Sequence, residues 1–332
     1  MNIDFNHRQS AHCESGVTAN LFFHHGIPLS EAMAFGIGSG LFFGYLPFVR
    51  VNGMPLVTFR SAPGSIFRRV AERLKVKVVR QRFRDPGKSM QALDRALEQQ
   101  IPVGLQTGVF WLPYFPPALR FHFNAHNLVV CGREGNDYRI SDPVIDEPVL
   151  CPREDLMQAR FAQGALAPKG AMFYLKSVPS EIDLRPAVRA GIREVGRRMI
   201  KTPVPIIGVR GIRFLAGQLE KWPQKLGPKR AGHYLGHLIR MQEEIGTGGG
   251  GFRFIYAAFL QEAAELLDQP GLGELSRELT GIGDRWREFA LFAARRCKGR
   301  GEEETSYPRL AKILRDCADR EEKLFRALLA EV

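Results

Sequence analysis

The stretch Ser10-Ala11-His12-Cys13-Glu14-Ser15-Gly16-Val17 opens the segment around which the chain is organised. Cys13, Val17 and Leu21 recur at i, i+4 and i+8, which is the spacing of one apolar face of an α-helix. Ser10 is a candidate N-cap, which would place Cys13 in the first helical turn. A thiol there meets unpaired backbone N–H groups and the positive helix end, which favour the thiolate. The stretch predicts either a nucleophile or an ordinary buried cysteine.

Length and composition limit the classes of protein that the chain can represent. Its 332 residues, 45% of them hydrophobic, indicate two domains with a core in each. No apolar run approaches the ~18 residues of a membrane span, and the N-terminus lacks an apolar signal core. Five cysteines without a CxxC pair argue against a disulfide framework and a zinc site. We therefore expect a cytoplasmic protein, and the sequence leaves its oligomeric state undefined.

The net charge of +12 requires a partner or a solvated basic surface. The basic residues are dispersed, and no nucleic-acid-binding motif accompanies them. An acidic protein partner would suit such a surface through electrostatic steering. We therefore expect no nucleic acid partner.

The residues up to Leu175 alternate between helical and strand patterns. The first helix is expected to end near Gly26, and Ser30 to cap the second one. The glycines from Gly36 to Gly40 do not fit a dinucleotide-binding motif, so they indicate close backbone packing or a wall open to a ligand. Further elements are expected at residues 56–59, 64–74, 76–79, 89–99, 102–107, 153–160 and 171–175. The aromatic, proline-rich residues 111–117 predict a stiff loop, either simply packed or forming a lip over a cleft.

A β-hairpin is predicted from His126 to Asp142. The turn contains Gly135-Asn136, and apolar residues alternate on both sides of it. His126 opens the first strand and Asp142 follows the second. Because the start of one antiparallel strand lies beside the end of the next, the hairpin places an imidazole near a carboxylate.

The composition changes near Pro179, after which only helical patterns occur. Helices are expected at residues 183–200, 205–221, 231–244, 252–267, 275–296 and 310–329. The boundary is set at 178/179, giving an α+β domain of residues 1–178 and an all-α domain of residues 179–332.

Cys13, His126 and Asp142 follow the chain order of papain-type sites, with a nucleophile, a base and an orienting residue. The residues around this order resemble a known family. His12-Cys13-Glu14, Ser30-Glu-Ala-Met-Ala-Phe-Gly-Ile-Gly-Ser-Gly, Leu112-Pro-Tyr and Asp142-Pro143 are similar to the N-terminal domain of the butirosin biosynthesis protein H family. Ile245-Gly-Thr-Gly-Gly-Gly-Gly-Phe-Arg-Phe-Ile-Tyr is similar to the helical domain often fused to it.

The resemblance implies a papain-like fold related to the peptidase domains of bacteriocin exporters. It implies that Cys13 carries an acyl group taken from an acyl carrier protein, with His126 as base and Asp142 as its orienter. The donor's phosphopantetheine arm would then be part of the substrate, with no bound cofactor and a small-molecule acceptor.

Several further residues are candidates for the site. Papain-type enzymes use a glutamine before the cysteine as an oxyanion donor, so Gln9 is a candidate beside the backbone N–H of Cys13. The candidate substrate-binding residues are Ser39, Tyr114, Arg253 and Tyr256. The loop from Gly246 to Gly251 could bind a phosphate at a helix N-terminus or serve as a flexible joint. His233 and His237 have ligand spacing without a third ligand, so no metal site is expected.

The sequence thus predicts a cysteine acyltransferase in specialised metabolite or lipid biosynthesis, with an amine or hydroxyl acceptor. A hydrolase with the same three residues, whether peptidase, amidase or thioesterase, is the alternative. A binding protein with a decayed site is a third interpretation, against which the intact Cys/His/Asp set argues.

Overall fold

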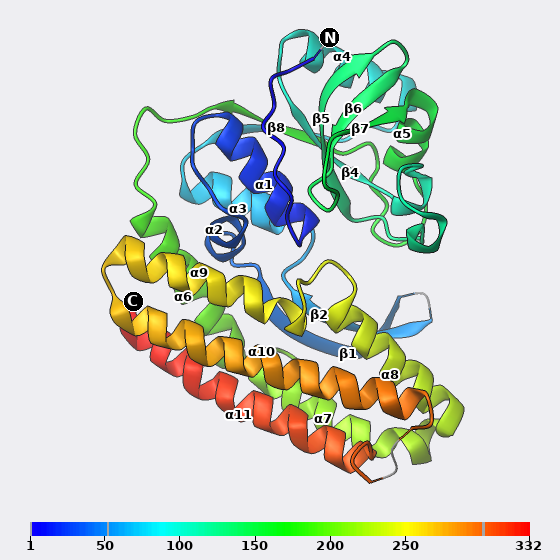
Figure 1. Cartoon of the computed structure of the whole chain (residues 1–332), viewed down its shortest axis with the longest axis vertical. Helices are drawn as coiled ribbons and strands as arrows, with labels where there is room; N and C mark the ends of the chain where they lie inside the picture. The colour runs from blue at the N-terminus through cyan, green and yellow to red at the C-terminus, as the bar shows by residue number, and fades with distance from the viewer. Residues whose placement is uncertain (1, 52, 301–302) are drawn as a thin grey trace. The chain divides into compact units, whose positions relative to one another are not determined.

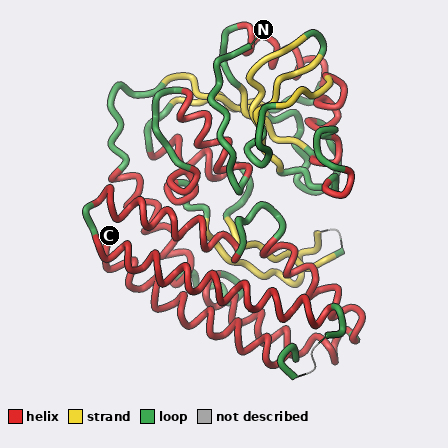
Figure 2. The backbone as a smooth tube through the Cα atoms, in the orientation of Figure 1, coloured by secondary structure: helices red, strands yellow, loops and turns green. Residues whose placement is uncertain are grey.

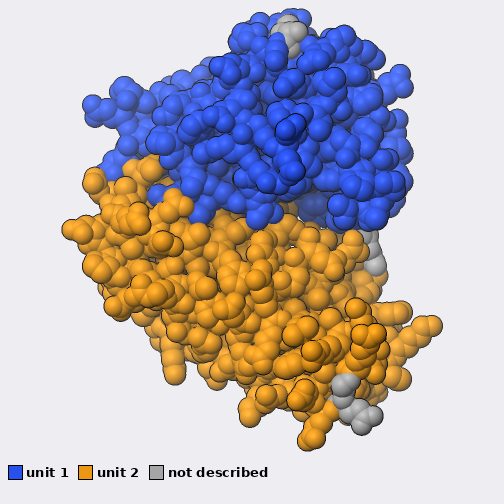
Figure 3. Space-filling view, in the orientation of Figure 1, with its two compact units in different colours: residues 1–34, 66–183 blue, residues 35–65, 184–332 orange. Residues whose placement is uncertain are grey.

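The computed structural model describes residues 2–51, 53–300 and 303–332, and the chain forms two compact units (Figures 1 and 3). Unit 1 contains residues 1–34 and 66–183, and unit 2 contains residues 35–65 and 184–332. Each unit is therefore assembled from two separate stretches of chain. The first division falls inside helix α2 (Glu31–Ile37).

Unit 1 is an α+β structure built on a six-stranded antiparallel sheet with the order β3-β8-β4-β5-β6-β7. Its elements, besides the start of α2, are α1 (Cys13–His24), α3 (Ser65–Arg73), β3 (Lys77–Gln81), α4 (Pro86–Glu98), β4 (Val103–Thr107), η1 (Val109–Trp111), η2 (Pro117–Leu119), β5 (His126–Glu134), β6 (Asp137–Ser141), β7 (Val149–Pro152), α5 (Arg153–Arg160) and β8 (Met172–Ser177).

The central strand β5 carries much of the core of unit 1. Its residues 126–132 are all buried, as expected of a strand covered on both faces. Leu128 and Val130 pack in one apolar cluster with Leu93 of α4 and Leu156 of α5. Helix α1 also contacts β5, so the N-terminus of α1 is held against the strand that begins at His126.

Unit 2 combines a two-stranded hairpin with helices (Figure 2). The elements are β1 (Leu41–Val51), β2 (Met54–Arg60), α6 (Arg185–Ile200), α7 (Gly208–Leu226), α8 (Pro228–Glu243), η3 (Gly250–Phe252), α9 (Arg253–Leu267), α10 (Pro270–Cys297) and α11 (Tyr307–Glu331). The prediction of an α+β part followed by a helical part is confirmed.

The hairpin β1–β2 belongs to unit 2 because of its side-chain partners. The rings of Phe43 and Phe59 lie 6.0 and 5.5 Å from the Trp286 ring, centroid to centroid. The N–H of Tyr45 donates to the carbonyl of Ile206 at 3.0 Å. The division at 183/184 lies near the expected boundary at 178/179. Residues 35–65, by contrast, belong to unit 2, whereas the sequence predicts them in the first domain.

Candidate active site

Cys13 is the first residue of α1, and the preceding residue caps this helix. His12 has extended backbone angles, and its ring Nδ1 accepts the N–H of Ser15 at 3.4 Å. The predicted cap, Ser10, instead donates its own N–H to the carbonyl of Pro143 at 2.6 Å. The prediction of Ser10 as N-cap was therefore wrong. Cys13 nevertheless lies in the first turn, where the positive helix end favours a thiolate.

The β5–β6 hairpin brings the predicted base and its orienter together. β5 begins at His126, and Asp142 follows the last residue of β6. His126 Nε2 lies 2.6 Å from Asp142 Oδ2, and the His126 side chain also hydrogen-bonds Cys13. Because Asp142 occupies Nε2, the ring nitrogen available to the sulfur is Nδ1. The structure thus unites the three residues predicted to perform the chemistry.

The electrostatics of His126 follow from these contacts. Burial alone lowers the pKa of His126, but the charge and hydrogen bond of Asp142, together with Cys13, raise it to about 10. The contacts with Asp142 and Cys13 therefore favour the protonated form of the His126 ring. An imidazolium beside the sulfur favours the thiolate, so the pair holds both a nucleophile and a proton donor.

The His–Asp pair is contacted by the aromatic, proline-rich residues 111–117, here called the aromatic loop, and by the backbone just after Asp142. Tyr114 donates its hydroxyl to Asp142 Oδ2 at 2.8 Å, and the backbone N–H of Val144 donates to Oδ1 at 3.2 Å. Burial, followed by the nearby Asp142 charge, raises the pKa of Tyr114, so it remains a donor. The Phe115 ring stands edge-on to His126, with centroids 5.6 Å apart. Tyr114, predicted as a substrate contact, is thus bonded to the orienting carboxylate.

Gly16, which has no side chain, lets the segment after Asp142 pack closely against α1. A Cβ at Gly16 would lie 2.6 Å from Ser10 Cβ and 2.7 Å from Pro143 Cβ, which is too close for side-chain carbons. Pro143 directly follows Asp142. The lack of a side chain at Gly16 therefore allows α1 and the orienting carboxylate of Asp142 to lie close together.

Asn127 is a site residue that the sequence analysis missed. Its Nδ2 lies 3.9 Å from the Cys13 sulfur and also donates to the carbonyl of Ala125 at 3.1 Å. The side chain is almost fully buried. An asparagine next to a strand-opening histidine has no distinctive pattern, so only the folded structure identifies it as an amide donor beside the sulfur.

The predicted side-chain oxyanion donor, Gln9, has a different role. Gln9 is exposed, and its Nε2 donates to Asp146 Oδ1 at 2.8 Å. The amide therefore ties the N-terminal segment to the loop after Asp142. The structure does not support Gln9 as an oxyanion donor.

Three predicted substrate contacts are internal residues of unit 2. Ser39 is buried and donates its hydroxyl to Glu194 Oε2 at 3.1 Å. Arg253 is fully buried and pairs with Glu321 through two hydrogen bonds of 2.9 and 3.0 Å. Tyr256 is also fully buried. Their prediction as substrate contacts is corrected, because their motifs build the interior of unit 2.

The glycine loop before α9 has the geometry of a packed joint. Positive φ angles occur at Gly246 and from Gly248 to Gly251, a conformation that glycine adopts without strain. The N–H of Gly250 donates to both carboxylate oxygens of Glu243, at 3.1 and 3.3 Å. The Glu243 carboxylate thus accepts the N–H of Gly250, which the phosphate hypothesis needs as a donor to a ligand.

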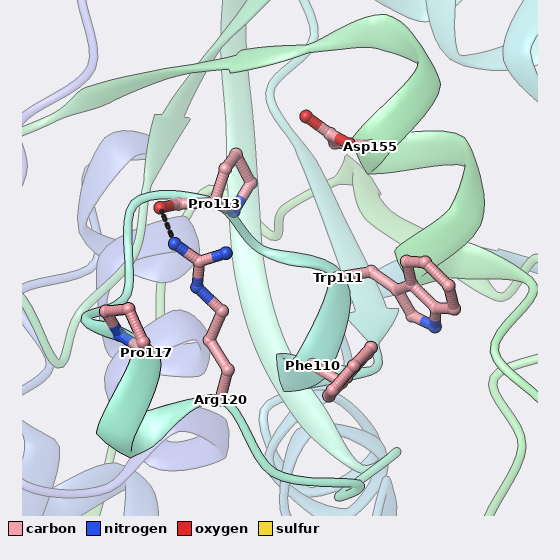
Figure 4. A pocket seen from close by; sticks show the side chains of 6 residues that line it. All are labelled: Phe110, Trp111, Pro113, Pro117, Arg120 and Asp155. Atoms are coloured by element: carbon pink, nitrogen blue, oxygen red, sulfur yellow. Dashed lines mark hydrogen bonds between the residues drawn. The ribbon is translucent and has the colours of Figure 1, made fainter.

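The aromatic loop also lines a hollow of about 350 Å³ (Figure 4). Arg120 fastens this loop by donating to the carbonyls of Phe115 and Pro113, at 2.7 and 2.9 Å. The residues that line the hollow are Phe110, Trp111, Pro113, Pro117, Arg120 and Asp155. The loop thus contacts the His–Asp pair through some residues and borders an open hollow with others.

The described residues form neither a metal site nor a membrane-spanning helix. No three His, Cys, Asp or Glu side chains within residues 2–51, 53–300 and 303–332 gather as metal ligands. No helix formed by these residues is long and apolar enough to cross a bilayer.

A thiol at a helix N-terminus, an imidazole opening a strand and a carboxylate after the next strand form the arrangement that cysteine enzymes of papain type use. Comparisons with known families give two matches. Residues 12–143 match the family described as butirosin biosynthesis protein H, N-terminal, and residues 154–328 match a domain of unknown function, DUF4872. The second match covers more than half of the chain, which therefore belongs to the DUF4872 family. Its first part matches the butirosin biosynthesis protein H N-terminal family, which confirms the resemblance seen in the sequence.

Among solved structures, a C39-like peptidase from Bacillus anthracis is similar to this chain. The identity is 21% and the TM-score 0.37, over 54% of this chain and 98% of the other. No curated protein matches the chain.

Proposed function

We propose that this protein is a cysteine acyltransferase that moves an acyl group from an acyl carrier protein to a small-molecule acceptor. The observation that carries the proposal is the arrangement of Cys13, His126 and Asp142 in a butirosin biosynthesis protein H N-terminal domain. The acceptor atom is an amine or hydroxyl.

In the first half-reaction, the Cys13 thiolate attacks the carbonyl carbon of the donor thioester. The carbonyl oxygen becomes an oxyanion, which the backbone N–H of Cys13 and the Asn127 amide stabilise. The C–S bond to the carrier then breaks, and its thiolate takes the proton of the His126 imidazolium. The products are acyl-Cys13, neutral His126 and the carrier thiol.

In the second half-reaction, the acceptor attacks the carbonyl carbon of acyl-Cys13 and gives its proton to neutral His126. The acyl–sulfur bond breaks, which restores the Cys13 thiolate and the imidazolium. Asp142 holds the ring in one orientation and stabilises its charge in both half-reactions. If water takes the place of the acceptor, the same steps give the alternative hydrolase.

The basic surface supports an acidic carrier protein as donor. A group of exposed cations on and beside the edge strand β3 has no ion-pair partner among the described residues; its members are Lys75, Lys77, Arg80, Arg82, Arg84 and Lys88. Such charges act mainly on association rate, and salt screens them. Raising the salt concentration should therefore slow acylation by carrier-bound donor more than acylation by the same group on a small thiol.

The hollow beside the aromatic loop is our proposed binding place for the acceptor. Its lining includes the exposed rings of Phe110 and Trp111 and the side chain of Asp155 (Figure 4). Aromatic faces and a carboxylate attract a protonated amine.

The test is incubation with a panel of acyl-carrier thioesters, followed by intact mass measurement. The wild-type protein should gain one acyl group, and C13S should gain none. C297S is the matched control, because Cys297 is the exposed thiol outside the site and its loss should change nothing. An acceptor amine should then remove the acyl group faster than buffer does. Undiminished acylation of C13S would refute the proposal, and equal loss in buffer would favour the hydrolase.

A further inference from the structure

The carboxylate of Glu31 accepts hydrogen bonds from the two backbone N–H groups directly before the nucleophile, Cys13. Its Oε1 accepts the N–H of His12 at 2.7 Å, and its Oε2 accepts the N–H of Ala11 at 3.0 Å. Oε1 also accepts the hydroxyl of Ser15 at 3.2 Å. All four residues belong to unit 1, and none has a part in the chemistry described above.

The position of Glu31 is itself fixed. It is the first residue of α2, and the hydroxyl of Ser30 caps that helix by accepting the N–H of Met33 at 2.9 Å. Burial raises the pKa of Glu31, and the three hydrogen-bond donors act on this pKa in the opposite direction. Hydrogen bonds to a carboxylate are stronger than hydrogen bonds between neutral groups. The two bonds to Glu31 therefore restrain the peptide groups on both sides of Ala11.

The restraint reaches the backbone N–H of Cys13 through one residue, His12. His12 is the N-cap of α1 with extended backbone angles, and the peptide that follows it carries the N–H of Cys13. The direction of this N–H therefore depends on the Ala11–His12 peptide group, which Glu31 holds, and on the two torsions of His12. An oxyanion donor must be aimed at the developing charge before reaction to contribute fully.

We propose that Glu31 is a positioning residue, which aims the backbone N–H of Cys13 at the oxyanion formed during acyl transfer. The inference rests on the proposed function, since it assigns a role within the same site. It also accounts for the Ser30-Glu31 segment, which carried part of the family resemblance.

The experiment compares two reactions of the same sulfur. Iodoacetamide alkylates a thiolate without forming an oxyanion, whereas 4-nitrophenyl acetate acylates it through one. In E31Q, the amide keeps one acceptor and loses the other, so acylation should fall about tenfold relative to alkylation. E31D, whose carboxylate is too short to bridge both N–H groups, should change the ratio in the same direction. E98Q, at an exposed glutamate at the end of α4, should leave it unchanged.

Folding is checked with the buried thiols of Cys131, Cys151 and Cys317, which should stay unlabelled in every variant. An unchanged ratio in folded E31Q or E31D, or an equal fall in both rates, would overturn the inference. A wild-type Cys13 that takes no acetyl group would overturn it together with the proposed function. A wild-type protein that takes acetyl but no acyl group from any carrier would contradict the proposed function only, and the ratio would still decide the role of Glu31.

Discussion

Replacing Gly16 by alanine should damage catalysis far more than stability. The added Cβ would lie 2.6 Å from Ser10 Cβ and 2.7 Å from Pro143 Cβ, so relief to a normal contact requires a shift of about 1 Å. Overpacking costs about 1–3 kcal/mol, while alanine in a helix gains about 1 kcal/mol over glycine. The net loss of stability is therefore only about 0–2 kcal/mol. A displacement of about 1 Å at Asp142 can slow the reaction about a hundredfold.

The assay measures Cys13 acylation by stopped-flow release of nitrophenolate, and the free energy of unfolding by urea titration. The matched control is G217A in α7, because a Cβ at Gly217 meets no atom within 4 Å. This variant should gain up to about 1 kcal/mol of stability and keep its acylation rate. A G16A protein that acylates at the wild-type rate would show that the approach of Pro143 to α1 does not position Asp142.

Three further predictions concern other parts of the chain. In D142N, the pKa of His126 should fall from about 10. The stability lost relative to wild type should therefore be greatest below about pH 6.5 and shrink as the pH rises towards 10. Urea titrations across this pH range test the prediction. R253M leaves the carboxylate of Glu321 buried without its cation and should lower the free energy of unfolding by about 3–5 kcal/mol, with Cys13 alkylation unchanged. W111A should raise the KM for the acceptor severalfold, and an unchanged KM would exclude the hollow as the acceptor site.

The chemistry of the site was predictable where it depends on local pattern. The helix beginning at Cys13 and the hairpin from His126 to Asp142 are short-range features, since periodicity and turn residues specify them. Antiparallel pairing then brings His126 and Asp142 together without further information. These are the parts of the site that the structure reproduces as expected.

The remaining assignments depend on contacts between residues distant in sequence. Gln9 could not be assigned correctly, because its partner Asp146 lies in another loop. Arg253 follows a glycine run that also fits a phosphate site, and its partner Glu321 is revealed only by the packing of the helices. Asn127 shows no signal at all, since its role depends on its distance to Cys13.

The division of each unit into two stretches of chain affects how the protein is made. During synthesis, the hairpin of residues 35–65 leaves the ribosome long before Trp286, against which Phe43 and Phe59 pack. These rings stay without their partner until most of the chain exists, which is a period of exposure to aggregation and chaperones. A fragment ending at residue 183 would retain the same exposed rings. A protein made of unit 1 alone should therefore omit residues 35–65 and join Ala34 to Ile66 through a linker, rather than simply end the chain after residue 183.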